Sequence, residues 1–205
     1  MGRLTQATAM KLVMCVHFGS EGATAIALAF DDWEAAEAGR SYFSQVATTA
    51  QTVPIVQTVQ AVQAVPTLPT GPLAGVSKPA RDEPDLRALP GLLQLLRKHA
   101  LQPEVIVIDG SVHLDAQAKP GLGQHLYQAL GGRSAVIGIS KTARPDLPAQ
   151  FAVYRDEEAA PLVVTCAGID LGAAKARVRA MHGKRRVPTL LKLAARMAKA
   201  DKASG

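Results

Sequence analysis

The sequence predicts a single α/β domain in which helices flank a mixed β-sheet, and three observations lead to this prediction. Residues 105–108 and 135–140 are apolar and mainly β-branched, which is typical of strands buried on both faces. A glycine-broken loop and a helical segment over 122–130 separate them, so the three form one strand–helix–strand unit. The chain has 205 residues, 48% hydrophobic and 20% charged, which fits one folded domain.

Two antiparallel strands are predicted to open the domain. The apolar segments 11–18 and 23–30 are joined by Gly19-Ser20-Glu21-Gly22, a turn-rich stretch. Residues 41–49 suit a third strand, although their alanines and glutamine also suit a helix. Residues 1–10 are polar and unpatterned, and we interpret them as an N-terminal extension that precedes a domain over 11–198.

The middle of the chain has an unusual periodicity. Valine recurs every three residues from Val53 to Val65, a period that matches neither a strand nor a helix well. A proline-rich stretch over about 66–85 follows, which we interpret as an insertion or as a lid over a site. Residues 86–101 carry leucines at helical spacing and predict an amphipathic helix that returns to the strand at Val105.

The last 35 residues are strongly basic. They contain ten Lys or Arg residues against the single acid Asp201, a net charge of +9 in a chain whose total is +6. Segments 175–181 and 189–200 predict helices, and residues 199–205 a tail. Such an end can neutralise phosphates, which gives most non-specific nucleic-acid affinity. The alternative is a solvated helix face with a tail.

The two cysteines and the hydropathy of the chain indicate where in the cell the protein is expected to be. Cys15 and Cys166 lie in apolar, strand-like contexts, where free cysteines act as small hydrophobes in a reducing compartment. No stretch approaches the roughly 18–20 apolar residues of a membrane span, and no signal-peptide pattern opens the chain. The sequence therefore predicts a cytoplasmic protein without a membrane partner.

Two charged residues end the two buried strands. Asp109 follows the first and Lys141 follows the second. The carboxyl ends of strands are where open α/β sheets bind ligands, so a carboxylate and an ammonium group should meet there. This pair suits a metal and a phosphate. The alternatives are ordinary Asp-Gly turn chemistry and a surface lysine.

Three segments in this order resemble the endonuclease V family. They are the strand that ends in Asp109-Gly110, Gly-Leu-Gly-Gln-His-Leu at 121–126 and Ile-Gly-Ile-Ser-Lys at 137–141. The resemblance covers roughly residues 11–198. It implies an RNase H-like mixed sheet flanked by helices. It also implies a DNA-repair nuclease that cuts near deoxyinosine, or near inosine in RNA, using magnesium.

Three further segments follow in family order. Pro66-Thr67-Leu68-Pro69 resembles the family's Pro-Tyr-Ile-Pro wedge, residues 161–165 its late strand, and Arg185-Arg186-Val187-Pro188-Thr189 its closing segment. The resemblance implies nucleic-acid contacts by Pro66, Thr67, Leu68 and Pro69, and the basic charge predicts contacts by Lys184, Arg185 and Arg186. Thr67 replaces the wedge tyrosine and cannot stack on a base, which weakens base reading.

The family's catalytic residues carry over only in part. Asp109 and Lys141 match, whereas His17 takes the place of the first aspartate. The family glutamate falls either at Ala88 or on the Asp82-Glu83 pair. The late histidine falls near Gly168, and Asp170 lies close by in the sequence.

Two metal sites are conceivable. Magnesium or manganese would need the carboxylates of Asp109, of Asp82 or Glu83, and of Asp170, because magnesium prefers oxygen ligands. His17, His113 and Asp109 instead offer a mixed nitrogen and oxygen site for zinc or manganese. Ordinary structural histidines are the alternative.

Three functions remain open at this point. The first is an endonuclease V-like protein that binds DNA or RNA and has weakened or lost its metal-dependent cleavage. The second is an active endonuclease with a rebuilt site that uses Mg²⁺ or Mn²⁺. The third is a protein-interaction module on the same scaffold. These functions differ in what should lie near Asp109. An active endonuclease needs Asp82 or Glu83, and Asp170, close to it, whereas Ala88 at that place indicates a lost metal site.

Overall fold

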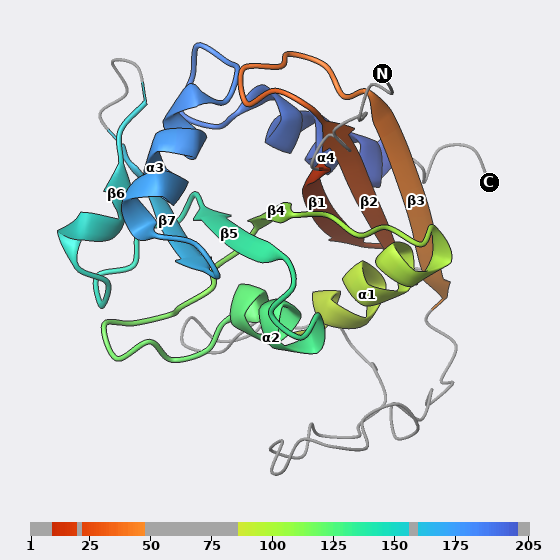
Figure 1. The fold of residues 1–205 in the computed structure, drawn as a ribbon, viewed down its shortest axis with the longest axis horizontal. Helices are drawn as coiled ribbons and strands as arrows, with labels where there is room; N and C mark the ends of the chain where they lie inside the picture. The colour runs from red at the N-terminus through yellow and green to blue at the C-terminus, as the bar shows by residue number, and fades with distance from the viewer. Residues whose placement is uncertain (1–9, 20–21, 48–85, 156–159, 201–205) are drawn as a thin grey trace, which may run out of the picture.

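The computed structural model describes residues 10–19, 22–47, 86–155 and 160–200, which form a seven-stranded mixed sheet with helices on both faces (Figure 1). The strand order across the sheet is β3-β2-β1-β4-β5-β7-β6. The strands are β1 (Lys11–Phe18), β2 (Gly22–Phe30), β3 (Arg40–Ala47), β4 (Val105–Asp109), β5 (Ala135–Ser140), β6 (Ala152–Val153) and β7 (Leu162–Ala167).

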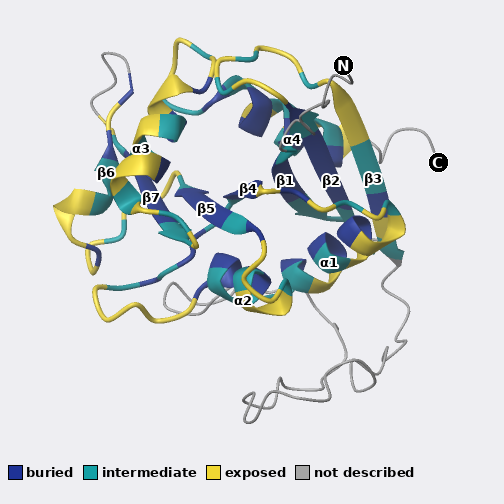
Figure 2. Cartoon of the chain, in the orientation of Figure 1, coloured by how far each residue is buried: buried dark blue, intermediate teal, exposed yellow. Residues whose placement is uncertain are grey.

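The centre of the sheet is parallel and its flanks are antiparallel. β4 pairs in parallel with β1 on one side and with β5 on the other. β2 runs antiparallel to β1, and β7 runs antiparallel to β5. The side chains of β4 from Val105 to Ile108 are at most 2% exposed, and the central strands are dark blue in Figure 2. Their β-branched composition therefore reflects burial on both faces.

Each face of the sheet has its own apolar cluster. α1 (Ala88–Lys98) and α2 (Leu122–Ala129) cover one face, where Leu92, Leu95 and Leu126 pack on alternate residues of β1 and β4. α3 (Leu171–Ala180) and α4 (Thr189–Ala200) cover the other face with a second cluster. Two helical layers thus leave the strand ends as the places where charged side chains can gather.

The predicted elements are largely confirmed. Residues 40–47 form a strand rather than a helix. α1 ends at Lys98, short of the predicted Leu101, because Ala100 adopts a left-handed conformation with φ 49°. α3 begins four residues before Lys175, because the Asp170 carboxylate caps its first turn by accepting a hydrogen bond from the Ala173 N–H at 3.1 Å.

Several of the sequence predictions concern residues that the structure does not describe. They are the N-terminal extension, the valine repeat, the proline-rich insertion and the end of the tail, which fall within residues 1–9, 48–85 and 201–205. Both cysteines are free, as predicted. In the described part of the chain, no helix combines the length and apolar character that a membrane span requires.

Candidate functional site

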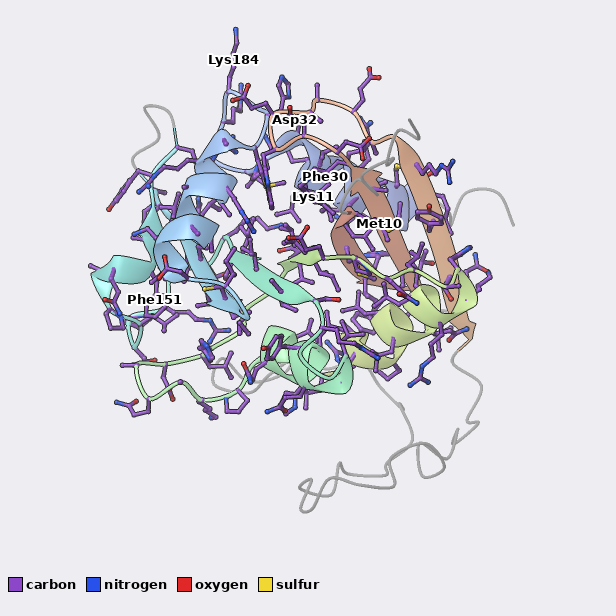
Figure 3. All side chains as sticks on the ribbon, viewed as in Figure 1. Met10, Lys11, Phe30, Asp32, Phe151 and Lys184 are labelled. Carbon is purple, nitrogen blue, oxygen red and sulfur yellow. The ribbon has the colours of Figure 1, made fainter. Side chains whose placement is uncertain are left out.

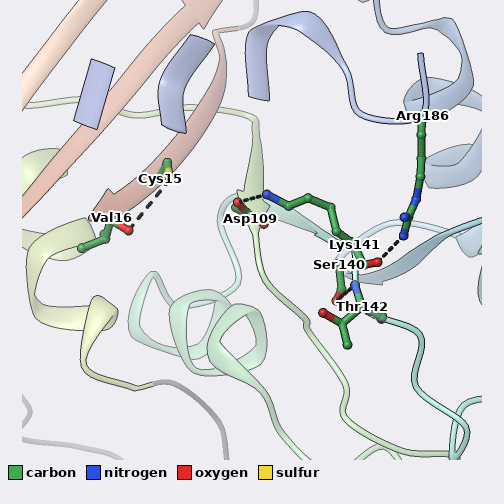
Figure 4. Close-up of polar contacts among 7 residues, drawn as sticks. All are labelled: Cys15, Val16, Asp109, Ser140, Lys141, Thr142 and Arg186. Carbon is green, nitrogen blue, oxygen red and sulfur yellow. Dashed lines mark hydrogen bonds and ion pairs between the residues drawn. The ribbon is translucent and has the colours of Figure 1, made fainter. Parts of the chain in front are cut away.

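An ion pair joins the ends of the two central parallel strands. Asp109 ends β4 and lies in register with Ile139 of β5, two residues before Lys141. The Lys141 ammonium donates to Oδ2 of Asp109 at 2.7 Å (Figure 4). The Asp109 side chain is 24% exposed and that of Lys141 44%, so solvent reaches both. The predicted meeting of a carboxylate and an ammonium group is confirmed, and we call this part of the molecule the Asp109 end of the sheet.

Cys15 of β1 is the side chain that faces Asp109. Met14 pairs with Ile108, so Cys15 is the next residue along β1 and stands opposite Asp109. The interpretation that His17 takes this place is therefore wrong, since His17 lies two residues further along the strand. Burial, and to a smaller extent the Asp109 carboxylate, raise the pKa of the Cys15 thiol to about 11, although Lys141 and Lys199 act in the opposite sense. The thiol is thus neutral near pH 7.

Asp170 lies at the other end of the sheet. β7 runs antiparallel to β5, so its last residue, Ala167, pairs with Val136 at the beginning of β5. Asp109 is level with Ile139 at the end of β5, and Asp170 follows Ala167 on the far side. The expectation that Asp170 joins Asp109 as a metal ligand is wrong because the antiparallel direction of β7 carries it away. Its carboxylate caps α3 instead.

The other expected ligands fall in two groups. Asp82 and Glu83 lie outside the described residues, as does the wedge-like segment 66–69. Ala88 begins α1 and is buried among the apolar residues on the α1 and α2 face. In the described part of the chain, no three His, Cys, Asp or Glu side chains form a group that could hold a metal. This contradicts the mixed site of His17, His113 and Asp109.

The described donors do not fit magnesium. Magnesium is held by carboxylates and other hard oxygen ligands, whereas Asp109 is already paired with an ammonium group and faces a neutral thiol. A two-metal nuclease site needs carboxylates that bridge two cations. The described residues at the Asp109 end are instead suited to bind an anion through their cations.

A basic loop between α3 and α4 lies against this end. Lys184 and Arg185 are exposed, and Lys184 points outward from the molecule (Figure 3). The Arg186 guanidinium donates to the Lys141 carbonyl (Figure 4). The predicted basic segment is therefore joined to the predicted charged pair, and we call Lys184–Arg186 together with Lys141 the cationic cluster.

A buried arginine fixes this loop. Arg155 is 5% exposed and donates to the carbonyls of Met181, Gly183, Arg185 and Arg186. A cation is favourable here because these carbonyls follow the carboxyl end of α3, where the helix dipole is negative. Sequence analysis did not find Arg155. Its signal would have been an arginine after the apolar pair Ala152-Val153, which is too weak to separate it from a surface residue.

Comparison with known proteins shows the fold. The endonuclease V of Bacillus subtilis has 17% identity and a TM-score of 0.62, covering 95% of this chain and 81% of that one. Human endonuclease V has 16% identity and a TM-score of 0.59, with 100% and 89% coverage. That of Ciona intestinalis, in complex with a 23-mer DNA containing an inosine followed by a ribo-adenosine, has 16% identity and a TM-score of 0.61, with 97% and 86% coverage.

No family model and no curated protein sequence matches the chain. The chain has the α/β fold of the endonuclease V structures, as the sequence motifs predict. Across that fold the sequence identity is only 16–17%.

Proposed function

We propose that this protein binds DNA or RNA at the Asp109 end of the sheet and has weak or no magnesium-dependent cleavage activity. The proposal rests on one observation, the ion pair between Lys141 and Asp109 at 2.7 Å. Lys141 provides a cation for a phosphate at this place, whereas the described residues around Asp109 include no group of three His, Cys, Asp or Glu side chains that could hold a metal. The free thiols also fit the cytoplasmic location that the sequence predicts.

The cationic cluster supports binding. Arg186 contacts the Lys141 carbonyl, and its chain neighbours Lys184 and Arg185 are exposed, so this loop presents positive charge to solvent. Phosphate neutralisation by such charges releases counterions and drives nucleic-acid association. Because Arg155 holds the loop by several hydrogen bonds, little ordering of the backbone is needed when a strand binds. The DNA complex of the Ciona intestinalis protein makes nucleic acid the ligand we favour for this fold.

The carboxylates described at the Asp109 end support the proposal of weak cleavage. In-line hydrolysis of a phosphodiester depends on charge held near the attacking and leaving oxygens, for which two-metal sites use several carboxylates. Among the described residues, Asp109 belongs to no group of three such ligands, and the Cys15 thiol opposite it is protonated near pH 7. The active endonuclease is the second candidate, favoured by the Asp109 carboxylate at the end of β4. It would need Asp82 or Glu83 at this end.

Binding is tested by fluorescence anisotropy with labelled single strands and duplexes, with and without inosine, over a range of salt concentrations. For roughly four phosphate contacts, the slope of log affinity against log salt should be about −3 to −4. Changing Lys184, Arg185 and Arg186 together to alanine should weaken binding and bring the slope closer to zero by about 2 to 3.

The matched control removes three basic residues elsewhere. Arg97 and Lys98 end α1 and Arg133 follows α2, and all three are exposed. These two helices cover the face of the sheet opposite α3 and α4. Changing all three to alanine lowers the net charge by the same amount as the Lys184, Arg185 and Arg186 variant. We expect this control to keep most of the affinity and most of the dependence of log affinity on log salt. If both triple variants bind alike, the positive charge acts only as a diffuse field and the proposed site is wrong.

Cleavage is tested by incubating the intact protein with the same oligonucleotides in Mg²⁺ or Mn²⁺. We expect little or no product over the time in which an active endonuclease V converts its substrate. Rapid metal-dependent cleavage that is abolished by Asp109→Asn would establish the second candidate and place Asp82 or Glu83 at the site.

A further inference from the structure

Tyr154 is the exposed large hydrophobic side chain of the described residues, with 58% of its surface open to solvent. It directly follows β6. Its neighbours Val153 and Arg155 are both buried, at 0% and 5% exposure. Alternation along an extended chain therefore turns the tyrosine ring outward while two buried neighbours anchor its backbone.

Strand pairing places Tyr154 at the Asp109 end. Ala152 pairs with Val163, which pairs in turn with Ser140 at the end of β5. β5 and β6 both run antiparallel to β7 and so point the same way. Tyr154 and Lys141 thus emerge from the same end of the sheet with one strand between them. Neighbouring strands lie about 4.8 Å apart, so the two chains are separated by roughly 10 Å.

A chain of contacts connects the tyrosine to the cationic cluster. Arg155, next to Tyr154, donates to the carbonyls of Arg185 and Arg186 at 3.2 and 3.3 Å. Arg186 in turn donates to the Lys141 carbonyl. The position of the tyrosine backbone relative to the cations is therefore set by directed hydrogen bonds rather than by a free surface loop.

An exposed aromatic ring near fixed cations matches the surface that single-stranded nucleic acid requires. Cations hold the backbone phosphates, and an aromatic ring stacks on a base without regard to its identity. A base paired within a duplex is already stacked, so the ring would gain contact only with an unpaired or extruded base. The separation of about 10 Å between the strands leaves room for a phosphate on the cluster and a base on the ring.

We propose that Tyr154 is a stacking platform for an unpaired base of a strand whose phosphates lie on Lys141 and Lys184–Arg186. This inference rests on the proposed function and specifies its ligand as single-stranded or locally unpaired nucleic acid. It also supplies an aromatic contact of the kind that Thr67 in the wedge-like segment cannot make.

The test compares variants of the intact protein in their binding to a labelled mixed-sequence single strand and to a fully paired duplex of the same sequence. Tyr154→Ala should weaken single-strand binding roughly 5- to 100-fold, the loss associated with one base–aromatic stack. Tyr154→Phe should retain the affinity, because the ring remains. Tyr154→Leu should behave like Tyr154→Ala, although it keeps apolar bulk. Duplex binding should change less than twofold in all three variants.

Two controls exclude trivial causes. Phe151→Ala removes a ring at the other end of β6, where Phe151 lies far from Lys184 in Figure 3, and should not change single-strand affinity. Tyr154→Trp adds a fluorophore to a chain that contains a single tryptophan, Trp33. Its added emission should be quenched when a single strand binds, as expected for a stacked indole.

The outcomes separate the two proposals. If the wild type binds single strands but Tyr154→Ala and Tyr154→Leu bind equally well, the stacking inference is overturned and the proposed function stands. A loss confined to the triple variant of Lys184, Arg185 and Arg186 would lead to the same conclusion. If the wild type binds no oligonucleotide at low salt, both proposals fail.

Discussion

The two ends of the central parallel strands are held together in different ways. At the opposite end, where β4 and β5 begin, main-chain hydrogen bonds join Glu104 to Met10 and Ala135 to Glu104, each at 2.8 Å. The buried Ser134 hydroxyl donates to the Pro103 carbonyl at 2.7 Å. These bonds are short and do not involve a charged group.

The Asp109 end also has a main-chain hydrogen bond, from the Gly110 N–H to the Ile139 carbonyl at 3.0 Å, but it adds long charged side chains. Lys141 reaches Asp109, Arg186 reaches the Lys141 carbonyl, and Arg155 reaches the loop that follows α3. Such side chains can exchange a partner within the protein for a phosphate of a ligand without any change in the main chain. The two ends therefore differ in their charged side chains, and the Asp109 end is the one where we propose that an anion binds.

The largest effect on this comparison should come from Arg155→Met. Several loop carbonyls would lose a buried charged donor, and hydrogen bonds to charged groups contribute about 1.5–3 kcal/mol each. We expect unfolding to become easier by about 3 kcal/mol or more in urea denaturation, and single-strand binding to weaken because the basic loop is released.

Arg133→Met is the matched control at the opposite end. Arg133 is exposed and donates to the Leu130 carbonyl at 3.2 Å, so its loss should cost less than about 0.5 kcal/mol. Equal effects of the two substitutions on unfolding would show that the buried guanidinium of Arg155 does not hold the loop.

The next effect concerns pH and the two thiols. In the folded protein the pKa of Cys15 is raised from 9.0 to about 11, mainly by burial. Above pH 9 the unfolded chain loses the thiol proton while the folded chain keeps it. The stabilisation by Cys15 is therefore complete below pH 9 and is lost as pH rises towards 11, by about 2 kcal/mol.

Urea denaturation of the wild type and of Cys15→Val at pH 8 and near pH 11 measures this loss. The wild type should lose about 2 kcal/mol more than the variant between the two values. Cys166 pairs with Ile137 near the opposite end, is half-buried and has a pKa raised by burial and then by Asp170. Cys166→Val should give a smaller difference. Parallel pH profiles for the wild type and Cys15→Val would show that this thiol is accessible to solvent.

The sequence predicts the parts of the fold that have local signals. Buried β-branched runs identified β4 and β5, and regular leucine spacing identified α1 and α4, because burial on two faces or on one helix face imposes a pattern within a few residues. β6 was missed because two residues carry no period. The bounds of α3 were missed because a capping side chain, rather than apolar periodicity, sets its start.

The site was predictable only where it coincides with strand ends. Asp109 and Lys141 follow apolar runs, so their meeting could be foreseen. Cys15 could not be distinguished from His17, because a shift of two residues keeps side chains on the same face of a strand and leaves the apolar pattern unchanged. Arg155 was invisible because its partners lie 26 to 31 residues further along the chain.

The smallest expected effect on stability comes from Asp109→Asn, which tests directly whether the Asp109 end is an anion site. The pair it breaks is partly exposed, and such ion pairs contribute about 0–1 kcal/mol, so unfolding should change by less than that amount. Binding should respond instead, because Lys141 is released to a phosphate and one negative charge is removed. We expect tighter single-strand binding and a salt slope more negative by up to about 0.7.

Glu104→Gln is the matched control for Asp109→Asn. Glu104 is exposed and precedes β4 at the opposite end, so this substitution changes the net charge equally but should leave the slope unchanged. If both substitutions tighten binding alike, only the overall charge matters. If Asp109→Asn instead weakens binding, and does so only when Mg²⁺ is present, the carboxylate takes part in holding a cation. The Asp109 end would then be an active endonuclease site rather than an anion-binding site.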